Sequence, residues 1–150
     1  MAQFETAFYE PSLWQGKYIG LAIASAGVIQ FRRRVFIKKN VLKARVYLAA
    51  GGFAELWLNG RRITQNVLEP ANTDYNKHVY YNTYDVTDAL LNGEYNALGV
   101  RLSGGWAGHG RFLFQAYINY EDGSEESIFS EFGPWLASLS EITLAALYAG

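Results

Sequence analysis

Apolar and polar residues alternate with a period of two over much of this chain, a pattern that predicts β-strands. In residues 42–50 the even-numbered positions are apolar and share one face, while Lys43, Arg45 and Tyr47 lie on the other. Residues 111–120 repeat this alternation. Each stretch therefore predicts a strand with one buried face.

Two turn signals predict β-hairpins. Asn59 and Gly60 stand between apolar runs, and both tolerate the positive φ that a type I′ turn requires. Asp122-Gly123 follows the second alternating stretch, so residues 125–129 should return as its partner strand. Further strands are expected at residues 30–37, 79–83, 97–102 and 142–147.

A second signature follows the first hairpin, in residues 84–96. Thr87 can cap a helical turn that continues through Leu91 and that Asn92-Gly93 ends. Short strands at close spacing, with turn signals between them, predict an all-β fold. We expect an antiparallel β-sandwich with one short helical turn, forming a single module over residues 1–150.

Composition narrows the function classes. Half of the 150 residues are hydrophobic and 18% are charged, as in a globular domain. The net charge of −1 gives no field that would attract nucleic acid or an anionic membrane, so neither is expected as a partner. The absence of cysteine excludes disulfides, thiolate metal sites and cysteine nucleophiles. The amino terminus lacks the order of a secretory signal, which leaves the compartment open and slightly favours the cytoplasm.

The segment 64–77 breaks the strand pattern and is rich in side chains that bear oxygen. Such side chains can hydrogen-bond sugar hydroxyls or ligate Ca²⁺, although oxygen-rich loops are often ordinary solvated turns. Long loops on a rigid sheet are where binding sites usually lie. The oxygen-bearing candidates are Asn66, Glu69, Asn72 and Asp74.

A second irregular segment, 103–110, places Trp106 and His109 among four glycines. Tyrosine and tryptophan offer flat apolar faces to sugar rings, and aromatic residues make up 16% of this chain. Aromatic residues also fill the cores of β-sandwiches. Trp106 is equally consistent with a ligand-facing side chain and with a cover for the end of the sandwich.

Catalytic patterns are weak. There is no Gly-x-Ser-x-Gly elbow, and the glycine-rich segment 104–110 lacks the lysine of a phosphate-binding loop. Glu69 and Asp74 could in principle act as a carboxylate pair in glycoside hydrolysis, but no residue is assigned a catalytic role. The run Arg32-Arg33-Arg34 is explained by a solvated strand face, with an interdomain salt-bridge patch as the alternative.

These motifs, in this order, resemble the N-terminal β-sandwich module of bacterial α-L-rhamnosidases, and the resemblance covers nearly the whole chain. The same hairpin and turn motifs also occur in related jelly-roll domains of other glycoside hydrolases. The resemblance is carried by residues 49–63, 67–70, 73–77, 84–88 and 104–106, with 4–8, Trp14 and 120–124 as flanking matches.

The resemblance implies a jelly roll like a galactose-binding domain, without catalytic acids of its own. It also implies that the chain is a fragment of a larger multidomain glycoside hydrolase. Some members of the family bind rhamnose with a Ca²⁺ ion near the loop after the hairpin. This sequence has Thr64-Gln65 where Gly-Asp is usual, and Ala71-Asn72 where Gly-Trp is usual. Because hard cations favour carboxylates, calcium is doubtful, and no cofactor or metal ligand is assigned.

The leading hypothesis is a non-catalytic accessory module that binds or positions rhamnose-containing glycans, with weak affinity. The alternative is a purely structural module that packs against other domains of the parent enzyme. A third reading, that the chain is itself a small hydrolase, is the least favoured. The candidate sugar-binding residues are Asn66, Glu69, Asn72, Asp74, Tyr75, Trp106, His109 and Arg111.

Overall fold

The computed structural model describes residues 8–21, 27–105 and 110–145, which form short strands with two single-turn 3₁₀ helices. The strands are β1 (Ile19–Gly20), β2 (Ile29–Phe36), β3 (Val41–Gly51), β4 (Phe53–Leu58), β5 (Arg61–Arg62), β6 (Tyr81–Asp85), β7 (Tyr95–Ser103), β8 (Arg111–Tyr120), β9 (Glu125–Phe129) and β10 (Leu136–Leu139). The helices are η1 (Pro11–Leu13) and η2 (Thr87–Ala89). No helix in these described ranges is long and apolar enough to cross a membrane.

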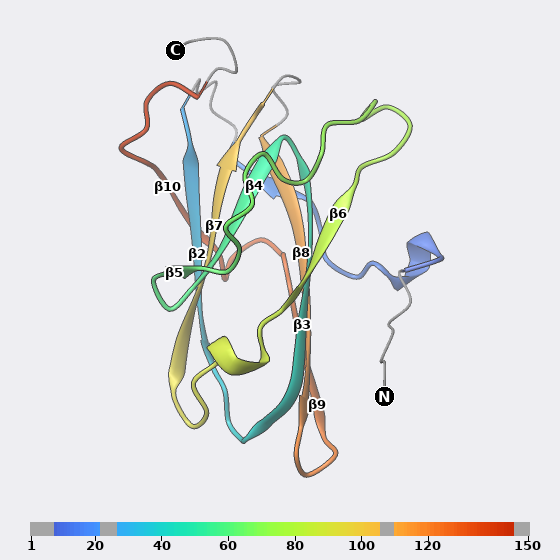
Figure 1. Ribbon diagram of the computed structural model, residues 1–150, viewed down its shortest axis with the longest axis vertical. Helices are drawn as coiled ribbons and strands as arrows, with labels where there is room; N and C mark the ends of the chain where they lie inside the picture. The colour runs from blue at the N-terminus through green and yellow to red at the C-terminus, as the bar shows by residue number, and fades with distance from the viewer. Residues whose placement is uncertain (1–7, 22–26, 106–109, 146–150) are drawn as a thin grey trace.

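The strands form two five-stranded antiparallel sheets that pack face to face (Figure 1). Sheet A has the order β1-β8-β3-β6, with β9 also paired to β8. Sheet B has the order β10-β2-β7-β4-β5. This arrangement confirms the predicted antiparallel β-sandwich of the jelly-roll class.

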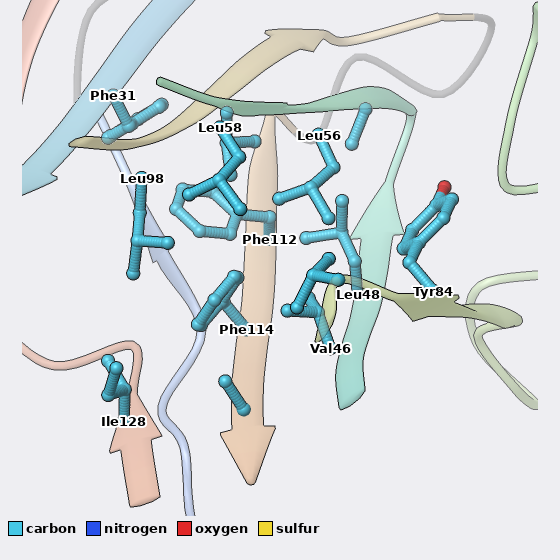
Figure 2. Packing of buried hydrophobic residues seen from close by; sticks show 14 of the residues in the cluster. Phe31, Val46, Leu48, Leu56, Leu58, Tyr84, Leu98, Phe112, Phe114 and Ile128 are labelled. Carbon is cyan, nitrogen blue, oxygen red and sulfur yellow. The ribbon is translucent and has the colours of Figure 1, made fainter. Parts of the chain in front are cut away.

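The core lies between the two sheets and is built from the alternating apolar positions. Phe112 and Phe114 of β8 are fully buried and project toward sheet B, where Leu56 and Leu98 meet them (Figure 2). Alternation in the strand places their neighbours on the outer face. Burial of this apolar area is the main source of the free energy that stabilises the fold.

Residues 8–16 run across the outer face of sheet A (Figure 1). The Phe8 ring stacks on Tyr47 with a centroid distance of 4.3 Å. The side chain of Gln115, which is fully buried, accepts hydrogen bonds from the backbone N–H groups of Gln15 and Gly16 at 2.8 and 3.2 Å. Its amide donates to the Leu13 carbonyl at 2.9 Å. One glutamine therefore fastens a segment that lies about 100 positions away in sequence.

Two motifs that were separate in the sequence meet at one end of sheet B. Asn59 adopts the predicted positive φ of 51° in the turn between β4 and β5. Its side-chain amide donates to Oδ1 of Asn96 at 2.8 Å. Asn96 is buried, and it also exchanges hydrogen bonds with both backbone groups of Leu91 at 2.8 and 2.9 Å. The hairpin and the helical turn are thus joined by a pair of asparagines.

Several local predictions were wrong. Residues 142–145 do not form a strand, and residues 146–147 lie outside the described residues. The last strand in the described part of the chain is β10. The alternation did not reveal it because all four of its residues are exposed. Leu42 is 63% exposed because a bulge between Val41 and Lys43 shifts its register.

The predicted helical turn also differs in detail. It ends at Ala89, and the Thr87 hydroxyl does not cap it but accepts a hydrogen bond from the Ala44 N–H at 2.9 Å. The carboxylate of Asp85 supplies the local acceptor instead, because it takes the Thr87 N–H at 3.0 Å.

Candidate functional site

Described residues from both irregular segments line a hollow at one end of the sandwich. This hollow, here called the loop cavity, has a volume of about 540 Å³. The segment 64–69 lines it on one side, and Ser103 and Gly105 line it on another. Glu55 and Arg101, from the outer face of sheet B, also lie on its wall. A concave surface with a few convergent polar groups is the usual form of a small-ligand site.

The loop after β5 is held onto the sandwich by its backbone. The carbonyl of Glu69 accepts a hydrogen bond from the Ala54 N–H at 2.7 Å, and the following Pro70 is buried. The Asn66 N–H donates to the Thr64 hydroxyl at 3.1 Å. These contacts fix the polar side chains of the segment in place beside β4.

Asn66 and Glu69 are two polar residues on the wall of the loop cavity. The Asn66 amide donates to one carboxylate oxygen of Glu69 at 2.9 Å, and the Tyr84 hydroxyl donates to the other at 3.4 Å. Asn66 Oδ1 has no partner within the described part of the chain. The pair can therefore accept hydrogen bonds from the hydroxyl groups of a ligand.

Three other predicted site residues brace the same loop and do not line the cavity. The Tyr75 hydroxyl donates to Asn72 Oδ1 at 2.9 Å and accepts from the Gly52 N–H at 3.1 Å. The Asp74 carboxylate accepts from the Asn76 N–H at 3.2 Å and lies 3.4 Å from the Lys77 ammonium. Their polar groups are thus largely engaged within the protein.

The remaining candidates lie elsewhere. Arg111 begins β8 on the outer face of sheet A, where its guanidinium carbon is 5.8 Å from the centroid of the Tyr18 ring. Trp106 and His109 follow Gly105, which lines the loop cavity, but they lie outside the described residues. Of the eight predicted residues, the structure therefore brings Asn66 and Glu69 together in the cavity.

The fold and the sequence have counterparts among known proteins. Residues 39–150 match the family described as the alpha-L-rhamnosidase N-terminal domain. The chain belongs to this family.

Relatives of this rhamnosidase N-terminal domain are much longer proteins. An α-L-rhamnosidase from Formosa agariphila is 30% identical over 98% of this chain, which spans 18% of that relative. The α-L-rhamnosidase structure from Aspergillus terreus has a TM-score of 0.82 at 28% identity, with 94% of this chain and 18% of that chain covered. The α-L-rhamnosidase from Streptomyces avermitilis, solved in complex with L-rhamnose, has a TM-score of 0.77 at 35% identity, with 85% and 14% covered.

The rhamnosidase N-terminal domain also has cavity residues that sequence reasoning missed. Val67 and Leu68 are 67% and 60% exposed at the rim of the loop cavity, and Leu68 has a φ of 58°. A positive φ is unfavourable for leucine, and such backbone positions cluster at functional sites. The sequence signal for Val67 and Leu68 was an apolar pair within a polar loop. Arg101 had no such signal, because its place on the cavity wall depends on the register between β7 and β4.

The described residues of this domain do not fit a calcium site. No three of their His, Cys, Asp or Glu side chains come together as a metal site would require. In the loop cavity, the Glu69 carboxylate already accepts two hydrogen bonds, and the Glu55 carboxylate pairs with Arg62 at 2.7 Å. Hard cations need several free oxygen ligands, and this arrangement does not supply them.

The buried Tyr84 gives the rhamnosidase N-terminal domain a specific pH dependence. Burial raises the pKa of Tyr84 to about 12, with a hydrogen bond to Asn82 opposing the shift and the Glu69 carboxylate adding to it. A tyrosine in the unfolded chain has a pKa of about 10, so it loses its proton more readily there than in the folded protein. The stability that protonated Tyr84 contributes is therefore complete below about pH 10 and is lost as the pH rises through about 12.

We therefore expect Tyr84→Phe to lose less stability than the wild type when the pH is raised from about 8 to about 11, as measured by urea unfolding. Tyr18, Tyr117 and Tyr120, whose pKa values are also raised, contribute equally to both proteins. Equal losses in the two proteins would show that Tyr84 does not keep its proton in the folded state.

Proposed function

We propose that this domain is a non-catalytic accessory module of an α-L-rhamnosidase and binds rhamnose-containing glycans weakly at the loop cavity. The observation that carries the proposal is that residues of segments 64–69 and 103–105 line one cavity with a volume of about 540 Å³. The relative from Streptomyces avermitilis was solved in complex with L-rhamnose, which makes this sugar the first ligand to test.

The chemistry of the cavity suits a sugar. Asn66 and Glu69 present amide and carboxylate oxygens to hydroxyl groups, while the exposed Val67 and Leu68 offer apolar surface to the C–H faces of the ring. A ligand can add a hydrogen bond at Asn66 Oδ1, but the Asn66 amide and the Glu69 carboxylate are already bonded to each other, so at these groups a ligand must replace an existing hydrogen bond. The affinity is therefore weak.

An NMR titration of the ¹⁵N-labelled chain with L-rhamnose and methyl rhamnosides tests this proposal. Millimolar sugar should shift the amides of Asn66, Glu69 and Gly105, and should do so equally with and without Ca²⁺. Asn66→Ala should weaken binding by about tenfold, because it removes one hydrogen-bonding side chain.

Asn76→Ala is the matched control, since Asn76 is an exposed asparagine of the same loop that does not line the cavity. Trp106→Ala measures separately what the predicted aromatic residue contributes. If no amide shifts at millimolar sugar, with or without calcium, the sugar-binding role fails for this chain.

A second function, packing against other domains of the parent enzyme, is favoured by the same loop. Asn72, Asp74 and Tyr75 stabilise the loop instead of presenting free polar groups, and exposed apolar residues such as Val67 suit a protein contact. If Val67→Ser leaves sugar binding unchanged but weakens association with the remaining domains of the enzyme, the structural role is the better description.

We also propose that the chain has no hydrolase activity of its own. Glu69 lines the loop cavity but Asp74 does not, and Asp74 is paired with Lys77, so the two carboxylates do not face a common substrate position. Turnover of an aryl rhamnoside that Glu69→Gln abolished would contradict this.

A further inference from the structure

The outer face of sheet B carries a second hollow, here called the sheet groove, with a volume of about 650 Å³. It is lined by residues of β2, β7, β4 and β10, including Gln30, Arg32, Trp57, Gly99, Arg101 and Ser138. It is separate from the centre of the loop cavity, although Arg101 lies on the wall of both. Its volume lies within the range of small-ligand sites.

The cross-strand register explains why this face is hollow. Gly99 of β7 pairs with Arg32 of β2 on one side and with Trp57 of β4 on the other. Neighbouring strands lie about 4.8 Å apart, so the two side chains stand about 10 Å apart across a residue that has none. Gly99 is thus the floor of the groove, and Arg32 and Trp57 are its walls.

The Trp57 wall is held in position by polar contacts. Its indole N–H donates to a Glu55 carboxylate oxygen at 3.2 Å, and the Arg101 guanidinium carbon lies 4.8 Å from the ring centroid. An aromatic ring that is already oriented loses little conformational entropy when a ligand packs on it. A fixed, flat apolar wall beside an open floor suits a sugar ring.

The opposite wall carries unneutralised positive charge. Arg101 pairs with Glu141 at 3.2 Å and Arg62 pairs with Glu55, but Arg32 is exposed and forms no ion pair with any described residue. Arg34, two residues further along β2, lies over the Tyr95 ring at 3.6 Å instead of against a carboxylate. A guanidinium binds carboxylate and sulfate groups through two parallel hydrogen bonds.

We propose that the sheet groove binds an anionic pyranose residue of a glycan, with the ring against Trp57 and the carboxylate or sulfate ester against Arg32. The acidic surface of another protein domain would satisfy Arg32 and Arg34 but would leave the glycine floor and the aromatic wall unused. The combination of charge, flat wall and open floor therefore favours a sugar acid. This site goes beyond the loop cavity and does not depend on it.

The test uses the 150-residue chain and three probes: methyl β-D-glucuronide, D-glucose 6-sulfate and methyl β-D-glucoside. In an NMR titration, either anionic sugar should shift the Gly99 amide and the Trp57 indole N–H, whereas the neutral glucoside should not. Arg32→Gln should weaken binding of the anionic sugar by about tenfold, as expected for the loss of one charge-assisted pair. Lys38→Gln, which removes an exposed charge just beyond β2, is the matched control and should change little.

Gly99→Ala gives a second variant that keeps every charge. A Cβ at this position would lie 3.2 Å from the Trp57 Cβ and would raise the floor, so it should also weaken binding.

Shifts with the glucuronide, with the sulfate, or with both support the proposal and identify the anionic group. Equal binding of the neutral glucoside, no effect of Arg32→Gln, or no shift with either anion would overturn it. Shifts confined to Asn66 and Glu69 would support the loop cavity and reject this groove.

Discussion

Gly52→Ala is expected to lower the free energy of unfolding more than any other single substitution proposed for this domain. Gly52 is the one residue between β3 in sheet A and β4 in sheet B, and its φ is 131°. A Cβ there would collide with the Ser103 carbonyl oxygen and would lie 3.0 Å from the Gly104 carbonyl carbon. Strained backbone and overpacking each cost about 1–3 kcal/mol, so the loss should be about 2–6 kcal/mol.

Urea unfolding followed by circular dichroism measures this loss, and Gly60→Ala is the control. Gly60 also has a positive φ, of 79°, but a Cβ there would have no neighbour within 4 Å. Its loss should be limited to the backbone cost of about 1–2 kcal/mol. Similar losses of unfolding free energy in the two variants would mean that close contact with Ser103 and Gly104 is not what requires glycine at position 52.

Asn96→Leu is expected to be the second most damaging change. Leucine has a similar size but would leave both backbone groups of Leu91 and one donor of Asn59 without the partner that Asn96 now supplies. Buried polar groups left without partners cost about 1–3 kcal/mol each, and partial access to water limits the total to about 2–4 kcal/mol. The loss should appear in urea unfolding.

Faster hydrogen exchange of the Leu91 and Ala97 amides should accompany it, since the Ala97 N–H donates to the side-chain Oδ1 of Asn59, which this network orients. Asn76→Leu is the control, because Asn76 is exposed, and a change of less than about 0.5 kcal/mol is expected there. If the two substitutions cost the same, the asparagine pair does not join the hairpin to the helical turn.

The strands that build the core were predictable because their alternation is strong and uninterrupted. Residues 42–50 and 111–120 lie within β3 and β8, and the turn at Asn59-Gly60 has the expected geometry. β10 was missed because an exposed edge strand carries no alternation, and Leu42 was misplaced because a bulge changes the register without changing the local sequence. Local pattern therefore predicted the central strands, while edges and bulges depended on tertiary pairing.

The candidate site was predictable only in part, for a related reason. The sequence indicated which loops are irregular, but it could not show that Asn72 and Tyr75 are hydrogen-bonded to each other while Asn66 faces a cavity. Nor could it place Arg32 opposite Trp57, because they are separated by 25 positions and meet across an intervening strand through register alone. Residue types indicate possible ligands, but pairing decides which side chains share a surface.

The position of β2 determines where this domain can be cut. The family match begins at residue 39, yet β2 (Ile29–Phe36) forms ladders with both β7 and β10 in the interior of sheet B. A polypeptide trimmed to the matched region would lack β2, so β10 would have no strand to pair with. The backbone of β7 would also be exposed along one edge and could pair with other molecules. Expression boundaries for this domain should therefore be drawn from the sheet, upstream of residue 29, and not from the extent of sequence similarity.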